Sequence, residues 1–194
     1  CKEQPENEKV AEYAAVLLRQ SERLKKLIED LVEASKASTG SVDVLAAPCE
    51  VGVLLTQTVG EYEQRLREND LELIAKQPET PVRIMADGRH LWRVFDNLMN
   101  NVCKYAQGGT RVYLTVEEKN GEAAISFKNT SKYPLDISAD ELMARFVRGD
   151  SARSTDGNGL GLSIARSLTE LQNGRLELTV DGDLFKVVLY FSSI

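Results

Sequence analysis

Histidine and cysteine are scarce in this chain of 194 residues, which has one histidine, His90, and three cysteines, Cys1, Cys49 and Cys103. The cysteines show no metal-ligand spacing, so they predict no metal site. Their odd number fits a reducing cytoplasm better than a disulfide framework. We expect His90 to have a structural or solvated role near the start of a helix.

Long apolar runs and an excess of positive charge are also missing. No segment approaches the roughly 18 apolar residues of a membrane-spanning helix, and no signal peptide is visible. With 24 Lys and Arg against 30 Asp and Glu, the net charge of −6 gives no long-range attraction to nucleic acid or anionic lipid. The 42% hydrophobic content suffices for one core with a helical appendage. We therefore expect a soluble cytoplasmic fragment that contacts neither membrane nor nucleic acid.

The segment from Asn97 to Ala106 places polar side chains beside a predicted core. At about 100° per helical residue, one apolar stripe is formed by Leu91, Phe95, Leu98 and Val102. Another three residues cluster roughly 100° around the helix from that stripe: Asn97, Asn101 and Lys104. Each could be an ordinary solvated residue. Together they suit a magnesium–triphosphate complex, in which Asn101 supplies an oxygen ligand to Mg²⁺ and Lys104 neutralises phosphate charge.

A glycine-rich turn follows later in the chain, with glycines at Gly157, Gly159 and Gly161. It leads into a predicted helix with apolar spacing Leu160, Ile164, Leu168 and Leu171. Glycine permits close approach of a ligand, and a helix N-terminus offers unpaired N–H groups to phosphate. Alone, such a turn could equally be a flexible loop. Next to the asparagine segment, it predicts a nucleotide site.

These two segments resemble the N box and the second glycine box of sensor histidine kinases, whose ATP-binding fold is shared with gyrase, the Hsp90 chaperones and MutL. The stretch from Glu141 to Asp150 is similar to the kinase F box, in which Phe146 would help seat a lid over ATP. The resemblance covers nearly the whole chain. It implies ATP and Mg²⁺ as cofactors.

The N-terminal part predicts a long helix with one apolar seam. Apolar residues recur at seven-residue steps, at Val10, Leu17, Leu24 and Leu31, and Gly40 ends the pattern. Residues 21–40 resemble the second helix of the kinase dimerisation domain. We therefore divide the chain into this helix, residues 1–40, and a catalytic ATP-binding domain, residues 41–194.

The family's phosphoacceptor histidine lies on a first dimerisation helix, and nothing around His90 resembles its sequence context. The chain begins at Cys1 without Met. We therefore expect a fragment of a longer protein, most members of the family being membrane sensors, with the acceptor on a preceding helix. The resemblance implies a homodimer in the intact kinase and a response regulator receiver domain as partner.

The remaining pattern predicts an α+β two-layer sandwich, a mixed and mostly antiparallel sheet with helices on one face. We expect a short strand near residues 42–46, followed by a helix that Pro48 introduces. Asn120-Gly121 is a strong hairpin signal. The other expected strands are 71–75, 82–85, 110–117, 123–128, 175–180 and 184–191.

Two positions bear on activity. Where the kinases have the Asp of the first glycine box, which accepts a hydrogen bond from adenine, this chain has Asn129 and lacks the box's glycines. An amide keeps an acceptor oxygen, so we hypothesise that Asn129 faces the base. Where ATP-hydrolysing relatives have a general-base Glu, this chain has Asn97, as the kinases do. An amide cannot take a proton from water, so we predict little intrinsic ATPase activity.

The predicted function is transfer of the ATP γ-phosphoryl group to a histidine on the absent helix, for relay to a response regulator aspartate. Besides the residues above, the resemblance implies that Arg148 and Arg153 meet the phosphates and that Tyr105 borders the sugar or base. The turn would contribute Leu160 and Leu162. Two alternatives remain: a degenerate scaffold that has lost nucleotide binding, and a serine kinase of the anti-sigma type.

Overall fold

The computed structural model describes residues 4–38, 42–135, 138–143 and 159–194. The helices are α1 (Gln4–Ser38), α2 (Val51–Glu68), α3 (Gly88–Tyr105), α4 (Ala139–Met143) and α5 (Gly161–Glu170). The strands are β1 (Ala47–Glu50), β2 (Leu71–Lys76), β3 (Arg83–Ala86), β4 (Thr110–Lys119), β5 (Glu122–Thr130), β6 (Arg175–Asp181) and β7 (Leu184–Ser192).

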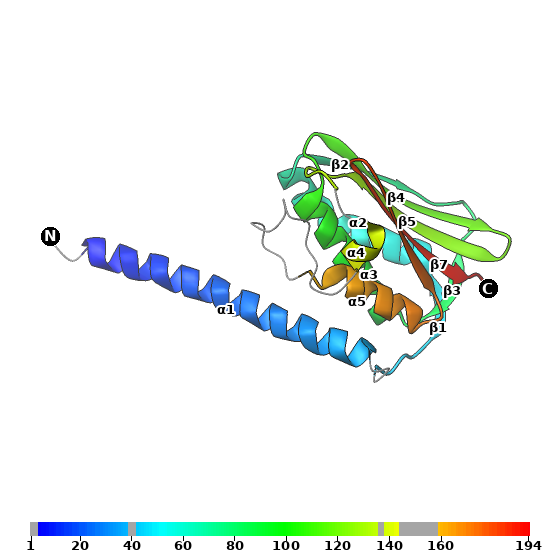
Figure 1. Ribbon diagram of the computed structural model, residues 1–194, viewed down its shortest axis with the longest axis horizontal. Coiled ribbons are helices and arrows are strands. Elements are labelled where there is room, and N and C mark those ends of the chain that lie inside the picture. The colour runs from blue at the N-terminus through cyan, green and yellow to red at the C-terminus, as the bar shows by residue number, and fades with distance from the viewer. Residues whose placement is uncertain (1–3, 39–41, 136–137, 144–158) are drawn as a thin grey trace.

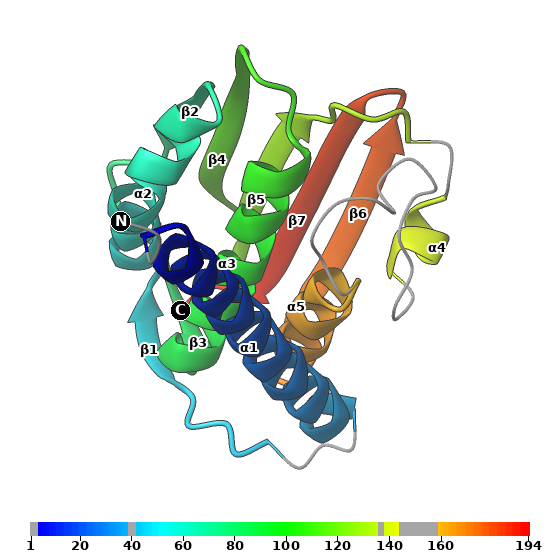
Figure 2. The same ribbon diagram turned by 90° about the vertical axis from the view of Figure 1, so that its left-hand side faces the viewer.

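Five strands form one sheet in the order β2-β4-β5-β7-β6, and β1 pairs with β3 in a separate ribbon. Only β2 and β4 are parallel in the larger sheet, and every other pair is antiparallel. Helices α2, α3 and α5 cover one face of this sheet (Figure 2). The predicted α+β two-layer sandwich is therefore confirmed.

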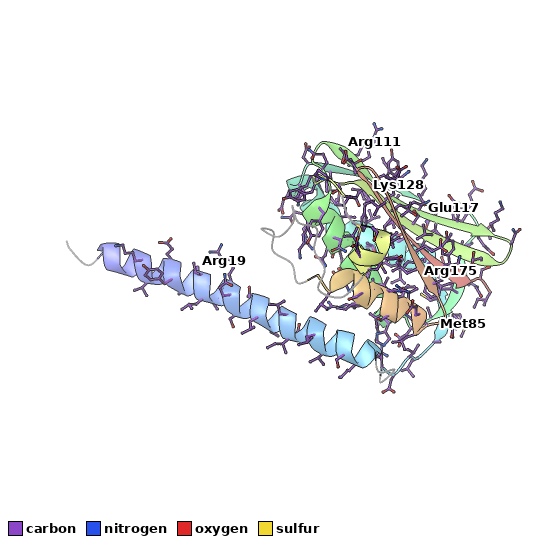
Figure 3. The ribbon with its side chains drawn as sticks, viewed as in Figure 1. Arg19, Met85, Arg111, Glu117, Lys128 and Arg175 are labelled. Carbon is purple, nitrogen blue, oxygen red and sulfur yellow. The ribbon has the colours of Figure 1, made fainter. Side chains whose placement is uncertain are left out.

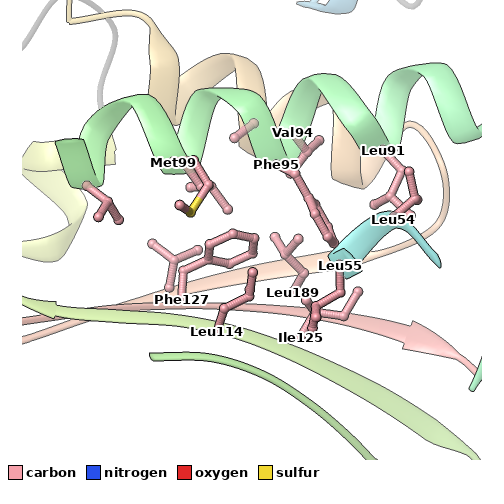
Figure 4. Close-up of a cluster of buried hydrophobic side chains, with 14 of the residues drawn as sticks. Leu54, Leu55, Leu91, Val94, Phe95, Met99, Leu114, Ile125, Phe127 and Leu189 are labelled. Atoms are coloured by element: carbon pink, nitrogen blue, oxygen red, sulfur yellow. The ribbon is translucent and has the colours of Figure 1, made fainter. Parts of the chain in front are cut away.

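The core lies between that sheet face and α3. Along β5, alternate residues are buried, which directs Ala123, Ile125 and Phe127 toward the helices. Phe95 of α3 meets Phe127 edge to face, with ring centroids 5.1 Å apart (Figure 4). The whole predicted stripe of α3 is buried here: Leu91, Phe95, Leu98 and Val102.

Helix α2 is fastened to α3 by a polar contact at the edge of the core. The Tyr62 hydroxyl donates to Oδ1 of Asp96 at 2.5 Å. Burial, and then this bond to a carboxylate, raise the pKa of Tyr62 well above its usual value. The two helices are thereby held side by side over the sheet.

The hairpin expected at Asn120-Gly121 is confirmed. Asn120 and Gly121 join β4 to β5 with φ of 56° and 76°, as a type I′ turn requires. Gly182, with φ of 56°, lies in the turn between β6 and β7.

The prediction near the start of the domain was wrong. The strand lies at Ala47–Glu50 rather than 42–46, and Pro48 is inside it instead of opening a helix. Because β1 pairs only with β3, it is an edge strand, where a residue without an N–H is tolerated. Pro48 also favours an extended residue before it, and the helix begins three residues later, at Val51.

Helix α1 extends away from the domain and meets it near α5, through its C-terminal part (Figure 1). The apolar seam of α1 is largely exposed, with Leu17 and Leu24 at 70% and 59% exposure. None of the described helices combines the length and apolar character that a membrane span requires.

Candidate nucleotide-binding site

Helix α3 presents the predicted polar residues at the edge of its buried stripe. The Asn97 side chain is buried, and its Nδ2 donates to the carbonyl oxygen of Arg93 at 2.9 Å. This bond fixes the amide so that Oδ1 remains for other contacts. Asn101 and Lys104 are half-buried, one and two turns further along the same side.

The two sequence segments meet where α3 passes the N-terminus of α5. A Cβ built at Gly161 would lie 3.4 Å from Oδ1 of Asn97 and 3.7 Å from Oδ1 of Asn101. Because residue 161 is glycine, the space in front of both amide oxygens is unfilled by a side chain. Predicted residues that are far apart in sequence thus form one cradle.

The start of α5 completes one side of this cradle. Gly159 has φ of 67°, a left-handed conformation that favours glycine, and Leu160 behind it is 1% exposed. Leu160 gives the helix no side-chain cap, so its side chain does not satisfy the first-turn N–H groups. Such groups bind phosphate oxygens readily. Leu162 is half-buried against the core.

The other end of the site is formed by the joined ends of α3 and β5. Lys132 N donates to Tyr105 O at 2.9 Å, and Gln107 N donates to Thr130 O at 2.8 Å. Asn129 is 4% exposed and lies on the helix-facing side of β5. Its Nδ2 donates to Thr130 O at 3.2 Å. This places Asn129 at the same end of the site as Tyr105, as the hypothesis of an adenine contact requires.

The segment that resembles the F box is described only at its beginning. Ser138 and Glu141 form a capping box: Glu141 N donates to Oγ of Ser138 at 3.2 Å, and Ser138 N donates to Oε2 of Glu141 at 2.9 Å. Met143 is buried. Four predicted site residues lie outside the described residues: Phe146, Arg148, Arg153 and Gly157.

One buried charge near the site's helices was missed by the sequence analysis. Asp87 caps the start of α3 by accepting from Arg89 N at 3.0 Å, and the Arg89 guanidinium holds the pKa of this carboxyl well below its usual range. An Asp before a predicted helix is an N-cap signal and could have identified it. His90 lies at this same end, its Nε2 3.2 Å from Asp43 O.

The polar groups of the cradle itself are amides and backbone N–H groups. In the described ranges, no group of three or more His, Cys, Asp or Glu residues could hold a metal ion. Amide oxygens are hard ligands that suit Mg²⁺, which takes most of its ligands from phosphate and water. These groups therefore have the chemistry expected of ligands for a magnesium–triphosphate complex.

Comparison with known proteins agrees with this geometry. Residues 86–192 match the family described as histidine kinase-, DNA gyrase B-, and HSP90-like ATPase. The sensor protein VanS of Enterococcus faecium is 27% identical over 86% of this chain and 43% of its own length. The signal transduction histidine-protein kinase BaeS of Escherichia coli (strain K12) is 27% identical over 85% of this chain and 36% of its own length. The chain thus spans less than half the length of these relatives.

Solved structures share the fold. The Acinetobacter baumannii histidine kinase AdeS superposes with a TM-score of 0.77 at 20% identity, over 92% of this chain and 82% of its own. Full-length ShkA in complex with AMPPNP superposes with a TM-score of 0.79 at 22% identity, over 95% of this chain and 39% of its own. The family match covers more than half of the chain and includes the helices that form the cradle. The chain therefore belongs to the histidine kinase-, DNA gyrase B- and HSP90-like ATPase family.

Proposed function

We propose that this chain is the ATP-binding catalytic part of a sensor histidine kinase. In this proposal, residues 41–194 bind ATP, and residues 1–40 form one helix of a dimerisation domain. The observation that carries it is the cradle at Gly161, where Asn97 and Asn101 of α3 face the N-terminus of α5. The relatives named as the sensor protein VanS and the signal transduction histidine-protein kinase BaeS support the assignment.

The residues of the cradle fit Mg²⁺ bound to a triphosphate. Asn101 would hold the ion through Oδ1, and the ion would supply positive charge that neutralises the phosphates. The N–H groups at the start of α5 bind phosphate oxygens, and Lys104 adds a positive charge on the same side of α3. Phosphoryl transfer depends mostly on such positioning and charge neutralisation.

The chain's own described residues at the cradle provide no general base to activate water against the γ-phosphoryl group. Asn97 is part of the cradle, and its Nδ2 donates to Arg93 O. An amide cannot remove a proton from an attacking water. The phosphoryl group is therefore kept for another nucleophile, which we propose to be a histidine on a separate helix of the intact protein.

The relay partner in this proposal is the receiver domain of a response regulator, which accepts the phosphoryl group on an aspartate. Histidine kinase ThkA, which superposes over 95% of this chain with a TM-score of 0.71, was solved in complex with the response regulator protein TrrA. The exposed seam of α1 supports a homodimer in the intact kinase. We also propose a membrane-anchored parent protein.

Isothermal titration calorimetry with Mg²⁺ and ATP tests the site directly. Asn101→Ala should weaken binding by about 10- to 100-fold, since losing one contact to a charged group costs about 1.5–3 kcal/mol. Asn100→Ala is the matched control, because Asn100 is the preceding residue and its amide donates to Asp96 O at 2.7 Å. Its affinity should stay within about twofold of the wild type.

Equal weakening by both substitutions would contradict the assigned role of Asn101. Absence of Mg²⁺-dependent binding by the wild-type chain would instead favour a degenerate nucleotide-binding scaffold. The anti-sigma type of serine kinase is the remaining alternative, and phosphorylation of a serine-bearing partner rather than a histidine-bearing helix would favour it.

A further inference from the structure

The chain between α1 and β1 is attached to the beginning of α3. Leu45 N donates to Oδ2 of Asp87 at 3.0 Å, and Nε2 of His90 lies 3.2 Å from Asp43 O. These are contacts between a connecting segment and residues more than forty positions later. Residues 42–46, which we call the linker, are therefore attached to the domain through their backbone, although the Leu45 side chain is exposed.

Asp87 is the centre of this attachment. Its side chain is 3% exposed, and Arg89 pairs with it through Nη2 at 2.9 Å. The backbone N of Asp87 donates to Oε1 of Gln172 at 2.8 Å, and Nε2 of Gln172 donates to Leu168 O at 2.8 Å. One residue therefore joins three elements: the linker, the start of α3 and the end of α5.

A helix cap alone does not account for this arrangement. A cap needs one acceptor oxygen, which a serine or asparagine also provides. Here Oδ1 accepts from Arg89 N while Oδ2 accepts from Leu45 N. A buried carboxylate is costly unless it is paired, and the Arg89 guanidinium provides that pairing. The second oxygen accepts from the linker as well as from Arg89, which a cap alone would not require.

The attachment lies beside the place where the C-terminal part of α1 contacts α5. A cavity of about 650 Å³ lies beside this contact, lined by Ile28 and Val32 of α1 and by His90 and Leu168 of the domain. The main contact of α1 with the domain is through α5, and the linker is the next described part of the chain after α1. The linker contact lies at the opposite end of α3 from Asn101 and Lys104.

We propose that Asp87 is a positioning residue that fastens the linker to the domain and so sets the direction of α1 relative to the nucleotide site. The inference goes beyond the proposed function, because it concerns the connection between α1 and the catalytic domain and does not require bound nucleotide. In an intact kinase, this joint would determine where the catalytic domain can present ATP.

Hydrogen exchange measured by mass spectrometry on the whole chain tests the linker contact. Asp87→Asn keeps a good helix cap but loses the charge and one acceptor. The Leu45 amide should exchange about 10-fold faster, the loss expected for one bond to a charged group. Amides of β5 should be unchanged, and so should the affinity for Mg²⁺ and ATP. Arg89→Gln, which leaves both oxygens of Asp87, should raise Leu45 exchange by less.

Arg111→Gln is the matched control. It removes an arginine–carboxylate pair with Glu72, 3.0 Å long, on the outer face of the sheet, and should leave Leu45 exchange unchanged. The direction of α1 is measured by spin labels on Arg19→Cys and Lys128→Cys, in a background with Cys1, Cys49 and Cys103 replaced by alanine. Arg19 lies on α1 and Lys128 on the sheet (Figure 3). The distance distribution should broaden in Asp87→Asn.

Three results would overturn the proposal. The first is Leu45 exchange that Asp87→Asn leaves unchanged. The second is faster exchange shared equally by β5, which would indicate global destabilisation. The third is an unchanged distance distribution between the labels. Loss of nucleotide binding in Asn101→Ala bears on the proposed function alone, so the two proposals fail independently.

Discussion

At the scale of single residues, the candidate site depends on amide side chains and on a missing side chain. Asn97 and Asn101 direct oxygens to a space that exists because residue 161 is glycine. An amide oxygen binds a hard cation without bringing a negative charge next to the phosphates. A carboxylate at position 97 would add that charge and a proton acceptor.

Gly161→Ala tests whether this space is used. The added Cβ would make ordinary van der Waals contacts of 3.4 Å and 3.7 Å with Asn97 and Asn101, so the fold should tolerate it. Alanine also favours helix, which should leave the melting temperature equal or slightly higher. The methyl group would occupy the space for ligand, and the affinity for Mg²⁺ and ATP should fall by about tenfold, or about 1.4 kcal/mol.

Calorimetry measures the loss of nucleotide affinity, and a thermal melt on the same preparation shows whether the stability of the fold has changed. Gly60→Ala is the control, because a Cβ there would meet nothing within 4 Å and Gly60 lies on α2. Unchanged nucleotide affinity in Gly161→Ala would show that ligand does not enter the cradle.

At the scale of elements, α1 has a chemical pattern that its own domain does not satisfy. Val10, Leu17, Leu24 and Leu31 repeat every seven residues, yet each is more than half exposed. A seam of this period is typical of a helix packed against other helices. A second copy of the chain, packed through the same seam, would bury it.

Leu24→Glu tests that association. Leucine and glutamate have similar helix propensities, so α1 should stay helical while the charge opposes burial of the seam. We expect light scattering to show a dimer for the wild type and a monomer for the variant at the same micromolar concentration. Arg19→Glu, about 200° around the helix from Leu17, is the control and should remain dimeric. A wild-type chain that stays monomeric at every concentration would contradict the prediction.

At the scale of the whole molecule, two helices on one sheet face bring the parts of the site together. The end of α3 that carries Asn101 faces the N-terminus of α5. The opposite ends of the two helices are joined by Asp87 and Gln172. The layer of helices therefore has the nucleotide cradle at one end and the linker at the other.

The whole chain should hydrolyse ATP at close to the background rate. Asn97 supplies no general base, and its amide is bonded to Arg93 O, so water at the cradle would not be activated. A coupled assay of ADP release, with an equal concentration of Asn101→Ala as the blank, measures this. Turnover comparable with a dedicated ATPase, abolished in the blank, would count against the kinase assignment.

Much of the fold could be predicted from local patterns. The turn at Asn120-Gly121, the alternation along β5 and the buried stripe of α3 are each encoded within a few residues, because they follow from backbone conformation and from periodicity. The strand β1 was misplaced for the opposite reason. Its position depends on pairing with β3, more than thirty residues later, and Pro48 has no local signal that distinguishes an edge strand from a helix start.

The sequence by itself determined which residue types are available to the site, from the asparagines and Lys104 of α3 to the glycine turn before α5. Only the tertiary structure decided that Gly161 faces Asn97 and Asn101, that Asn129 lies on the helix-facing side of the sheet, and that Asp87 binds Leu45. Periodicity fixes which face of a helix or strand a residue occupies. Which faces meet depends on how the sheet and its helices pack together, and that is a property of the whole chain.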